Sequence, residues 1–255
     1  MGSGAPGVPV EALTIDFWNT LFGTGNGPAR QRQRRDALTE ELASVGREFD
    51  DARLDQANRI AMGHFDTHWL HHRRTPGPRE LTEVLIVDLD VELPEESLDR
   101  IAQVFARGVL DHPPDLLPGV REALDDLSGT RQLALISDTA FSPGAILREL
   151  MEREGIARYF DAFVFSDETG VAKPDPVAFE RALAALKVEP AAAAHIGDIE
   201  RTDIAGAHAA GMHAILYRND EHLHVMAEDE TVAHVTVEHW AEVAPALERL
   251  ATRAP

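Results

Sequence analysis

Four places in the sequence put a polar side chain at or near the end of a short apolar segment. These side chains are Asp16 with Thr20, Ser137, Lys173, and Asp198 with Asp203. If the apolar segments form one parallel sheet, the side chains meet at its carboxyl edge, which is where open α/β sheets bind ligands. We therefore expect one cleft that collects carboxylates, hydroxyls and an ammonium group.

The carboxylates predict a site for a hard cation. Asp16 ends the segment LTID, Asp198 lies at the tip of another apolar segment, and Asp203 opens the helix behind it. Mg²⁺ prefers oxygen ligands and keeps several of its waters, so a pocket of this kind suits it. For Asp203 taken alone, the alternative is an acid at a helix N-terminus, where the helix dipole favours negative charge.

Lys173 and Ser137 add groups that suit an anion. Lys173 stands in VAKPDP just before a predicted helix, where an ammonium group can neutralise Asp16 and hold a substrate anion. The alternative is an ordinary surface lysine. Ser137 ends LALIS and can donate its hydroxyl to a bound oxyanion, although a serine at a strand end also commonly forms a cap or a turn.

Short apolar segments alternate with longer helical patterns, and this alternation predicts an α/β fold. Apolar runs such as LALIS and FVF suit strands that are covered on both faces. We therefore expect a doubly wound, Rossmann-like parallel sheet with helices on both sides. The predicted strands are 12–16, 132–137, 161–165, 193–197, 213–217 and 233–237. The predicted helices are 118–128, 143–154, 176–187, 202–210 and 239–252.

Local signals mark the ends of three of these helices. Ser142 before Pro143 and Asp175 before Pro176 each predict an N-cap followed by a first-turn proline. Gly211 falls where the helix 202–210 should end.

The region from 24 to 113 breaks the alternation, because it contains helical patterns and no convincing strand. A hinge is expected at 23–28, which holds three glycines and a proline, and HPPDLLPG marks the return at 112–119. We predict a core domain made of residues 1–23 and 114–255. A helical cap of residues 24–113 is inserted after the first strand and docks over the carboxyl end of the sheet.

Composition and charge exclude several classes of protein. The chain has 255 residues, is 44% hydrophobic and contains no cysteine, which allows a sizeable core and excludes disulfides and thiolate metal sites. It has no apolar run of about 18 residues and no apparent secretory signal, so we expect a cytoplasmic protein that does not span a membrane. The net charge of −20 argues against nucleic-acid binding and requires a locally positive site for any anionic substrate. The oligomeric state stays open, a homodimer included.

Taken in order, the four places resemble the motifs of the haloacid dehalogenase (HAD) superfamily. Motif one reads LTIDFWNTL, motif two LALISDT, motif three VAKPDP and motif four IGDIERTDIAGA. The resemblance covers 12–22 and 116–217, and the helical block is similar to the superfamily's inserted cap in position and size only.

The resemblance implies a role for each residue that matches a motif. Asp16 would be the nucleophile, which attacks phosphorus or carbon to form an aspartyl ester. Thr20 would support the loop around Asp16, and Ser137 and Lys173 would hold the phosphoryl group during transfer.

The same resemblance implies a magnesium site. Asp16, the backbone carbonyl of Trp18 and Asp198 would bind Mg²⁺, and Asp203 would support the metal site or Lys173. The metal and Lys173 would then let an anionic nucleophile approach an anionic substrate.

Trp18 departs from the family pattern. Family phosphatases usually carry an Asp two residues after the nucleophile, where it protonates the leaving alcohol and then activates water, help that is worth about 10²–10⁴ in rate. Tryptophan cannot replace it, because its indole is a hydrogen-bond donor only. Another acid would have to serve, or the leaving group would have to need none. The candidate acids are Asp138, His64, Asp66 and His68.

Three functions are compatible with Trp18. The first is a Mg²⁺-dependent phosphohydrolase acting on a small phosphorylated metabolite, a phosphate ester or anhydride, whose leaving group is good or is protonated elsewhere. The second is a 2-haloacid dehalogenase, whose relatives carry an aromatic residue here and whose halide leaves without a proton. Asp198 and Glu200 would then repel the substrate carboxylate, although an arginine could bind it (Arg30, Arg32, Arg34 or Arg35). The third is a binding module on a retired hydrolase fold.

Two histidines of the helical block lie one helical turn apart and could be taken for a zinc site. His64 and His68 occur in HFDTH, and pairs at this spacing can bind zinc. Because the sequence offers no third ligand in the HExxH pattern, we interpret them as a helix face that borders the cleft. Phe65 and Trp69 are expected in the core of the cap.

Overall fold

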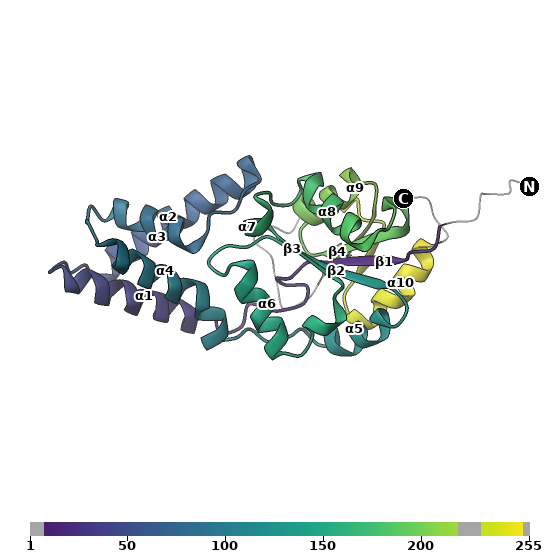
Figure 1. The fold of residues 1–255 in the computed structure, drawn as a ribbon, viewed down its shortest axis with the longest axis horizontal. Coiled ribbons are helices and arrows are strands. Elements are labelled where there is room, and N and C mark those ends of the chain that lie inside the picture. Colours follow the sequence, from purple (N-terminus) through teal and green to yellow (C-terminus); the bar gives the residue numbers. More distant parts are fainter. Residues whose placement is uncertain (1–7, 219–230, 252–255) are drawn as a thin grey trace, which may run out of the picture.

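The structure is a computed structural model, drawn in Figure 1, which describes residues 8–218 and 231–251. The first seven residues of the predicted core domain, residues 219–230 and the end of the predicted helix 239–252 lie outside the described residues.

The core is a parallel sheet of six strands in the order β3-β2-β1-β4-β5-β6. Its strands are β1 (Ala12–Ile15), β2 (Gln132–Ser137), β3 (Ala162–Phe165), β4 (Ala193–Gly197), β5 (His213–Tyr217) and β6 (Val235–Val237). The register pairs Ile15 with Leu135 on one side and with Ile196 on the other. The carboxyl ends of β1, β2 and β4 therefore lie next to one another.

Alternate residues of each strand serve the two faces of the sheet. Leu13 and Ile15 pack into one apolar cluster with the helices α5, α6 and α10, whereas Ala12 packs into a second cluster with α8 and α9. These helices are α5 (Val120–Ser128), α6 (Gly144–Arg153), α8 (Pro176–Leu186), α9 (Ala205–Ala209) and α10 (Val243–Leu250). The predicted doubly wound α/β fold is confirmed, with helices on both faces (Figure 1).

Shorter helical turns complete the core. The short helix α7 (Ser166–Thr169) follows β3 and was not expected from the sequence. The predicted helix 202–210 begins as a π-helical turn, Glu200–Ile204, before α9. Three 3₁₀ turns lie at Ala157–Tyr159, Pro190–Ala192 and Trp240–Glu242.

One of the predicted helix caps is wrong and one is confirmed. The helix α6 begins at Gly144, with Pro143 at the cap position, so Ser142 is not its N-cap. The carboxylate of Asp167 in α7 accepts the N–H of Gly144 instead, at 3.1 and 3.2 Å. The cap thus comes from a segment that only the fold brings near. Asp175 does cap α8, accepting from Val177 at 3.0 Å.

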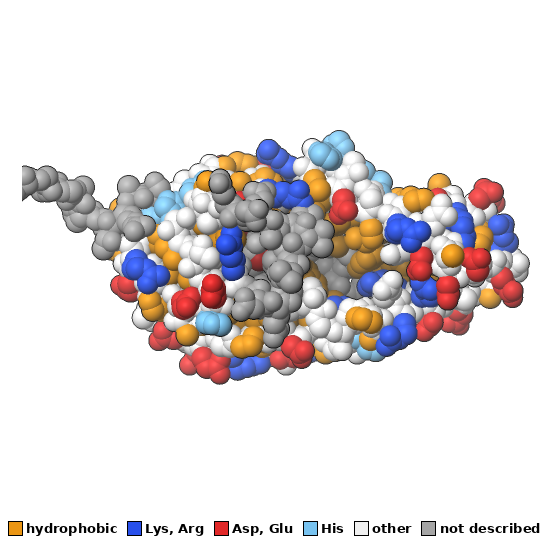
Figure 2. All heavy atoms as spheres, turned by 180° about the vertical axis from the view of Figure 1, so that it is seen from behind, with side chains coloured by type: hydrophobic (Ala, Val, Ile, Leu, Met, Phe, Trp, Pro, Cys, Tyr) orange, Lys and Arg blue, Asp and Glu red, His pale blue; other side chains and the backbone are white. Residues whose placement is uncertain are grey.

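Residues 27–111 form a helical lobe with its own apolar core. The lobe contains α1 (Gly27–Ser44), α2 (Asp51–His72), α3 (Pro78–Asp88) and α4 (Glu95–Asp111), as the insertion pattern predicts. Leu38, Leu54 and Ile101 lie at its centre, and Phe141 from the core packs against the same cluster. The lobe extends to one side of the sheet (Figure 1). Seen from the opposite side, the surface is hollowed between the lobe and the core, and acidic and basic side chains are interspersed (Figure 2).

Arg30 ties the two connections between the lobe and the core together. Its guanidinium is buried and donates to the carbonyl oxygens of Gly25 at 2.7 Å and His112 at 2.8 Å. The charge of Arg30, one of the arginines suggested as binding a substrate carboxylate, is therefore used to hold backbone carbonyls. Arg35 pairs with acids of α2, and Arg34 lies 4.5 Å from the Phe141 ring centre.

Among the described residues, no helix has both the length and the apolar character needed to cross a lipid bilayer.

Candidate active site

The sheet brings the predicted site residues to one edge, starting with Asp16. Its backbone N–H donates to the carbonyl of Ile196 at 2.9 Å, which extends the β1–β4 pairing by one residue beyond the strand. Ser137 is the last residue of β2, and Asp198 follows directly after β4. The expectation that these strand ends share one region agrees with the register.

Lys173 lies between two buried carboxylates. Its ammonium group is hydrogen-bonded to the carboxylate of Asp16 and donates to Oδ1 of Asp203 at 2.7 Å. The Lys173 residue is only 2% exposed, so it is not an ordinary surface lysine. Burial opposes its charge, but the negative charges of Asp16 and Asp203 raise the pKa of Lys173 above its usual value. The two carboxylates therefore favour the charged form of the Lys173 ammonium group beside Asp16.

Asp203 holds this ammonium group, and both of its carboxylate oxygens accept hydrogen bonds. Oδ1 also accepts from His195 Nε2 at 3.0 Å, and Oδ2 accepts the N–H of Ile199 at 3.0 Å. Burial opposes ionisation of Asp203, but the Lys173 charge and the His195 hydrogen bond together hold its pKa below the usual range. Gly197 leaves room for this arrangement, since a Cβ there would lie 2.3 Å from the Asp203 carboxyl carbon. Asp203 is thus a fixed anion rather than a surface helix cap.

His195 supports Asp203 from inside the sheet. Its Nδ1 lies 2.8 Å from the hydroxyl of Thr14 on the neighbouring strand, and its ring is completely buried. Burial lowers the pKa of His195. A neutral ring that carries its proton on Nε2 donates to Asp203 and adds no charge to the cluster.

Asp16 and Asp198 are destabilised as anions. Burial, opposed by the attraction of Lys173, raises the pKa of Asp16 to about 7. Burial, followed by repulsion from Asp16 and Asp203, raises the pKa of Asp198 well above its usual value. Asn19 donates its side-chain N–H to Asp198 at 3.3 Å. The negative charge of Asp16 therefore opposes the ionisation of Asp198.

Two hydroxyls of the predicted site are buried without a hydrogen-bond partner among the described residues. They are Ser137 Oγ and Thr20 Oγ1. The backbone of Thr20 is held in place, because its carbonyl accepts the indole N–H of Trp240 at 2.8 Å. Buried polar atoms are normally satisfied, so unpaired hydroxyls of this kind are suited to a ligand.

A comparison with known protein families shows which family the chain belongs to. A family model described as a haloacid dehalogenase-like hydrolase matches residues 10–211. The chain belongs to the haloacid dehalogenase-like hydrolase family. The resemblance of the four sequence motifs is thereby confirmed.

Curated relatives match only part of this family member. The haloacid dehalogenase-like hydrolase domain-containing protein 3 of Bos taurus is 36% identical over 104 residues, 41% of each chain. A phosphoserine phosphatase of Thermus thermophilus is 41% identical over 120 residues, 47% of each chain. The match thus spans less than half the length of these relatives.

One solved structure extends the likeness in fold to almost the whole chain. A 2-haloacid dehalogenase of Pseudomonas syringae pv. Tomato DC3000 is similar with a TM-score of 0.70 and 24% identity. The likeness covers 94% of this chain and 99% of that one. It shows that the haloacid dehalogenase-like fold includes the helical lobe of this chain.

Trp18 is part of the packing of the loop after Asp16. Its half-buried ring meets Phe17 edge-on, with 5.0 Å between ring centres, and Phe17 stacks on Phe22 at 4.7 Å. The N–H of Asn19 closes the loop on the carbonyl of Phe22 at 2.7 Å. In this haloacid dehalogenase-like hydrolase, position 18 therefore shapes the loop and offers no carboxyl group.

The sequence interpretation missed Trp69. Its ring was expected in the core of the cap, but its indole N–H donates to Oδ2 of Asp138 at 2.8 Å. Oδ1 of Asp138 accepts the N–H of Lys173 at 3.0 Å. A residue of the helical lobe thus reaches the segment that directly follows Ser137. No pattern around Trp69 indicates this, whereas His195, also missed, stands out as the one polar residue in AAAAHIG.

Within residues 8–218 and 231–251, Asp138 is the one of the four suggested acids that contacts a residue of the site, Lys173. Burial raises the pKa of Asp138, while both of its oxygens accept hydrogen bonds. His64 contacts Glu80 inside the lobe, and Asp66 is exposed. Glu200 accepts from the N–H of Val232 at 2.8 Å and from the hydroxyl of Thr231 at 2.7 Å.

The donor set at the sheet edge fits a divalent cation. Burial raises the pKa of both Asp16 and Asp198, and the charge of Asp16 raises that of Asp198 further. A cation bound by the two carboxylates would offset both effects. Their oxygens are the ligand type that Mg²⁺ prefers. Both oxygens of Asp203 are already occupied, which suits a supporting role.

Proposed function

We propose that this protein is a Mg²⁺-dependent phosphohydrolase that acts on a small phosphorylated metabolite through an aspartyl-phosphate intermediate. The observation that carries the proposal is the buried ion cluster: Lys173 holds Asp16 and Asp203 together, and Asp198 lies beside them. A dehalogenase needs no such collection of carboxylates, whereas a metal-assisted attack on a phosphate does.

Each residue of the cluster has a proposed part in the reaction. An oxygen of Asp16 attacks phosphorus, the bond from phosphorus to the leaving oxygen breaks, and water then hydrolyses the aspartyl phosphate. Lys173 and the hydroxyl of Ser137 hold the phosphoryl oxygens, and Thr20 supports the loop. These residues bring positive charge and donors into a protein whose net charge is −20.

Asp16, Asp198 and the backbone carbonyl of Trp18 would hold the Mg²⁺, with Asp203 supporting the site through Lys173. The bound metal would neutralise charge on the phosphate and on Asp16 as they approach each other. The carbonyl of residue 18 is available whatever side chain stands there, so the tryptophan does not disrupt this ligand set.

We further propose that residues 24–113 act as a cap over a core made of 1–23 and 114–255. Several contacts join the lobe to the sheet edge, among them Trp69 with Asp138 and the hydroxyls of Thr75 and Ser166 at 2.5 Å. The N–H of Ala172 also donates to the carbonyl of Arg73 at 2.7 Å. Opening and closing of the cap would admit the substrate and exclude water during transfer.

Trp18 defines the leaving group that this site can expel. Without a carboxyl group at position 18, an enol phosphate or an anhydride such as an acyl phosphate is favoured, because its leaving group needs no proton. The phosphoserine phosphatase among the partial relatives supports a phosphate substrate but does not define which one. The aromatic Trp18 also suits a 2-haloacid dehalogenase, yet the half-buried Asp198 beside Asp16 would repel a carboxylate substrate.

A substrate panel with and without Mg²⁺ tests the proposed function. We expect phosphate release from acetyl phosphate or another activated phosphate, abolished by a chelator and restored by Mg²⁺. Release of halide from 2-chloropropionate that is indifferent to the chelator would instead establish the dehalogenase. If neither phosphates nor 2-haloacids are turned over and Mg²⁺ does not bind, the remaining function is that of a non-catalytic binding module.

The change Trp18→Asp is expected to speed the hydrolysis of alkyl phosphates by about 10²-fold, the low end of what a general acid contributes. Activated phosphates should gain little, because their leaving groups need no proton. The ratio of kcat/KM for the two substrate classes is the measurement. Trp18→Phe is the matched control, since it keeps an aromatic ring and adds no acid. An equal effect of both variants would show that position 18 acts through packing alone.

A further inference from the structure

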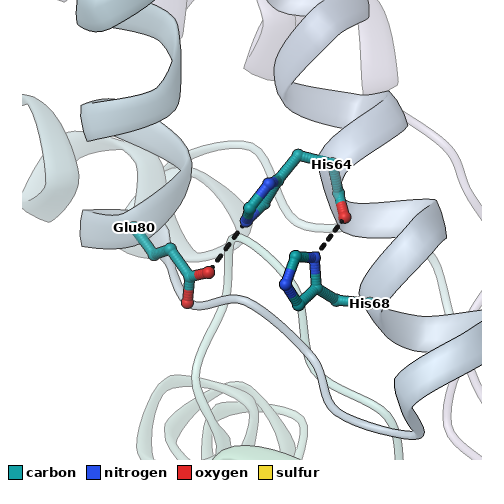
Figure 3. A group of neighbouring side chains, drawn as sticks. All are labelled: His64, His68 and Glu80. Atoms are coloured by element: carbon teal, nitrogen blue, oxygen red, sulfur yellow. Dashed lines mark hydrogen bonds and ion pairs between the residues drawn. The ribbon is translucent and has the colours of Figure 1, made fainter.

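A second group of metal-binding side chains lies in the helical lobe, apart from the cluster at Asp16. His64 and His68 stand one turn apart on α2, and Glu80 reaches toward them from α3 (Figure 3). The possible ligand atoms of the three residues all lie within 4.8 Å of one another. Among the described residues, this is the group of at least three His, Cys, Asp or Glu side chains whose ligand atoms come this close together.

The two histidines are arranged so that their ring nitrogens face the carboxylate. Nε2 of His64 lies 2.8 Å from Oε1 of Glu80, and the two imidazole rings are 4.1 Å apart. Nδ1 of His68 lies 2.9 Å from the carbonyl of His64, and its second nitrogen is on the side of Glu80 (Figure 3). Donation from Nδ1 to that carbonyl leaves Nε2 of His68 unprotonated, which is the tautomer a metal ligand needs.

Glu80 is held in position by a second partner. Arg74 donates to both of its oxygens at 2.7 Å. The carboxylate is therefore oriented, and it has lone pairs left for another bond. All three side chains are half-exposed, so an ion can reach them from solvent.

We propose that His64, His68 and Glu80 bind one first-row divalent metal ion, with Zn²⁺ the best match. Two imidazoles and a carboxylate are a donor set that suits Zn²⁺ and not Mg²⁺. Tetrahedral coordination at about 2.0–2.1 Å places ligand atoms about 3.3 Å apart, so only a small closure of the side chains is needed. The fourth position is left to water. Arg74 beside Glu80 opposes a bound cation, so the affinity is moderate.

The metal would join α2 to α3 at the residue next to Trp69. Since Trp69 makes the contact with Asp138, the site lies where an ion could stiffen the part of the lobe that meets the sheet edge. Binding to the folded chain alone also raises its melting temperature.

The test is a Zn²⁺ titration of the full chain in millimolar Mg²⁺, which keeps the carboxylates near Asp16 occupied. Binding is followed by calorimetry and by the ¹⁵N shifts of the histidine rings. We expect one equivalent, with ring shifts at His64 and His68. Each of the variants His64→Gln, His68→Gln and Glu80→Gln should lose about 10-fold or more in affinity.

His71→Gln is the matched control, because His71 is exposed on the same helix and outside the group. Melting curves without metal show whether each variant is folded. Zn²⁺ binding that survives His64→Gln would overturn the proposal in favour of the neighbouring pair His68 and His72, whose rings are 5.2 Å apart. Loss in the histidine variants with no effect of Glu80→Gln would reduce the site to two surface histidines. Absence of the ring shifts would reject it.

Discussion

Replacing Asp16 with asparagine is expected to lower kcat/KM for an activated phosphate by about 10⁴-fold or more, because the amide cannot act as the nucleophile. The side chain is buried and hydrogen-bonded to Lys173, which holds the carboxylate in place. Steady-state kinetics give the loss. Acid-quenched wild-type enzyme should also carry a phosphoryl group that hydroxylamine removes, and the Asp16→Asn protein should carry none.

The control for this change is Asp36→Asn, which alters an exposed carboxylate of α1 and should leave turnover intact. Circular dichroism and a melting curve establish that Asp16→Asn is folded. An asparagine variant that is folded and retains turnover would refute covalent catalysis by Asp16. A variant that loses turnover while the wild type shows no phosphoryl-enzyme would leave Asp16 as a metal ligand or base.

Lys173→Met is expected to destabilise the protein by about 3–5 kcal/mol and to abolish turnover. Removal of one partner of a buried ion pair leaves the other charge uncompensated, and here the ammonium serves both Asp16 and Asp203. Both carboxylates are almost completely buried, so solvent cannot take over the lost interaction. Urea unfolding of wild type and variant gives the difference in the free energy of unfolding.

Two further variants show whether the loss comes from the buried charges. Lys187→Met changes an exposed lysine at the end of α8 and should be nearly neutral. The double variant Asp16→Asn with Lys173→Met removes one of the stranded charges and should recover part of the stability. Equal unfolding curves for wild type and Lys173→Met would mean that the cluster adds nothing to stability. If the double variant is no more stable than Lys173→Met, the lost stability comes from the uncompensated charge of Asp203 alone.

The carboxylates Asp16 and Asp198 lower the stability of the fold. In this they differ from the apolar side chains of an ordinary protein core. Burial raises the pKa of Asp16 to about 7 and raises that of Asp198 well above its usual value, so folding opposes the ionisation of both carboxylates. A core built for stability alone would place apolar side chains at these positions. Sites that bind and react commonly depart from the most stable choice in this way.

The sequence by itself determined where most strands and helices of this protein lie. Strand positions follow from apolar runs bounded by polar residues, and the predicted strand 213–217 coincides with β5. The helical block between Gly23 and Pro113 could be recognised because its apolar positions repeat with the helix and never alternate as in a strand. Asp175 could be identified as a cap because its partner, Val177, is two residues away. Each of these features depends on neighbours along the chain.

Only the tertiary structure decided which distant side chains meet. Asp167 caps α6, His195 turns Asp203 toward Lys173, and Trp69 contacts Asp138 across the two parts of the molecule. Glu80 becomes a neighbour of His64 only through the packing of α2 against α3. These contacts depend on how helices lie against the sheet and against one another. Periodicity specifies which face of a helix is buried, but not which residue of another element that face will touch.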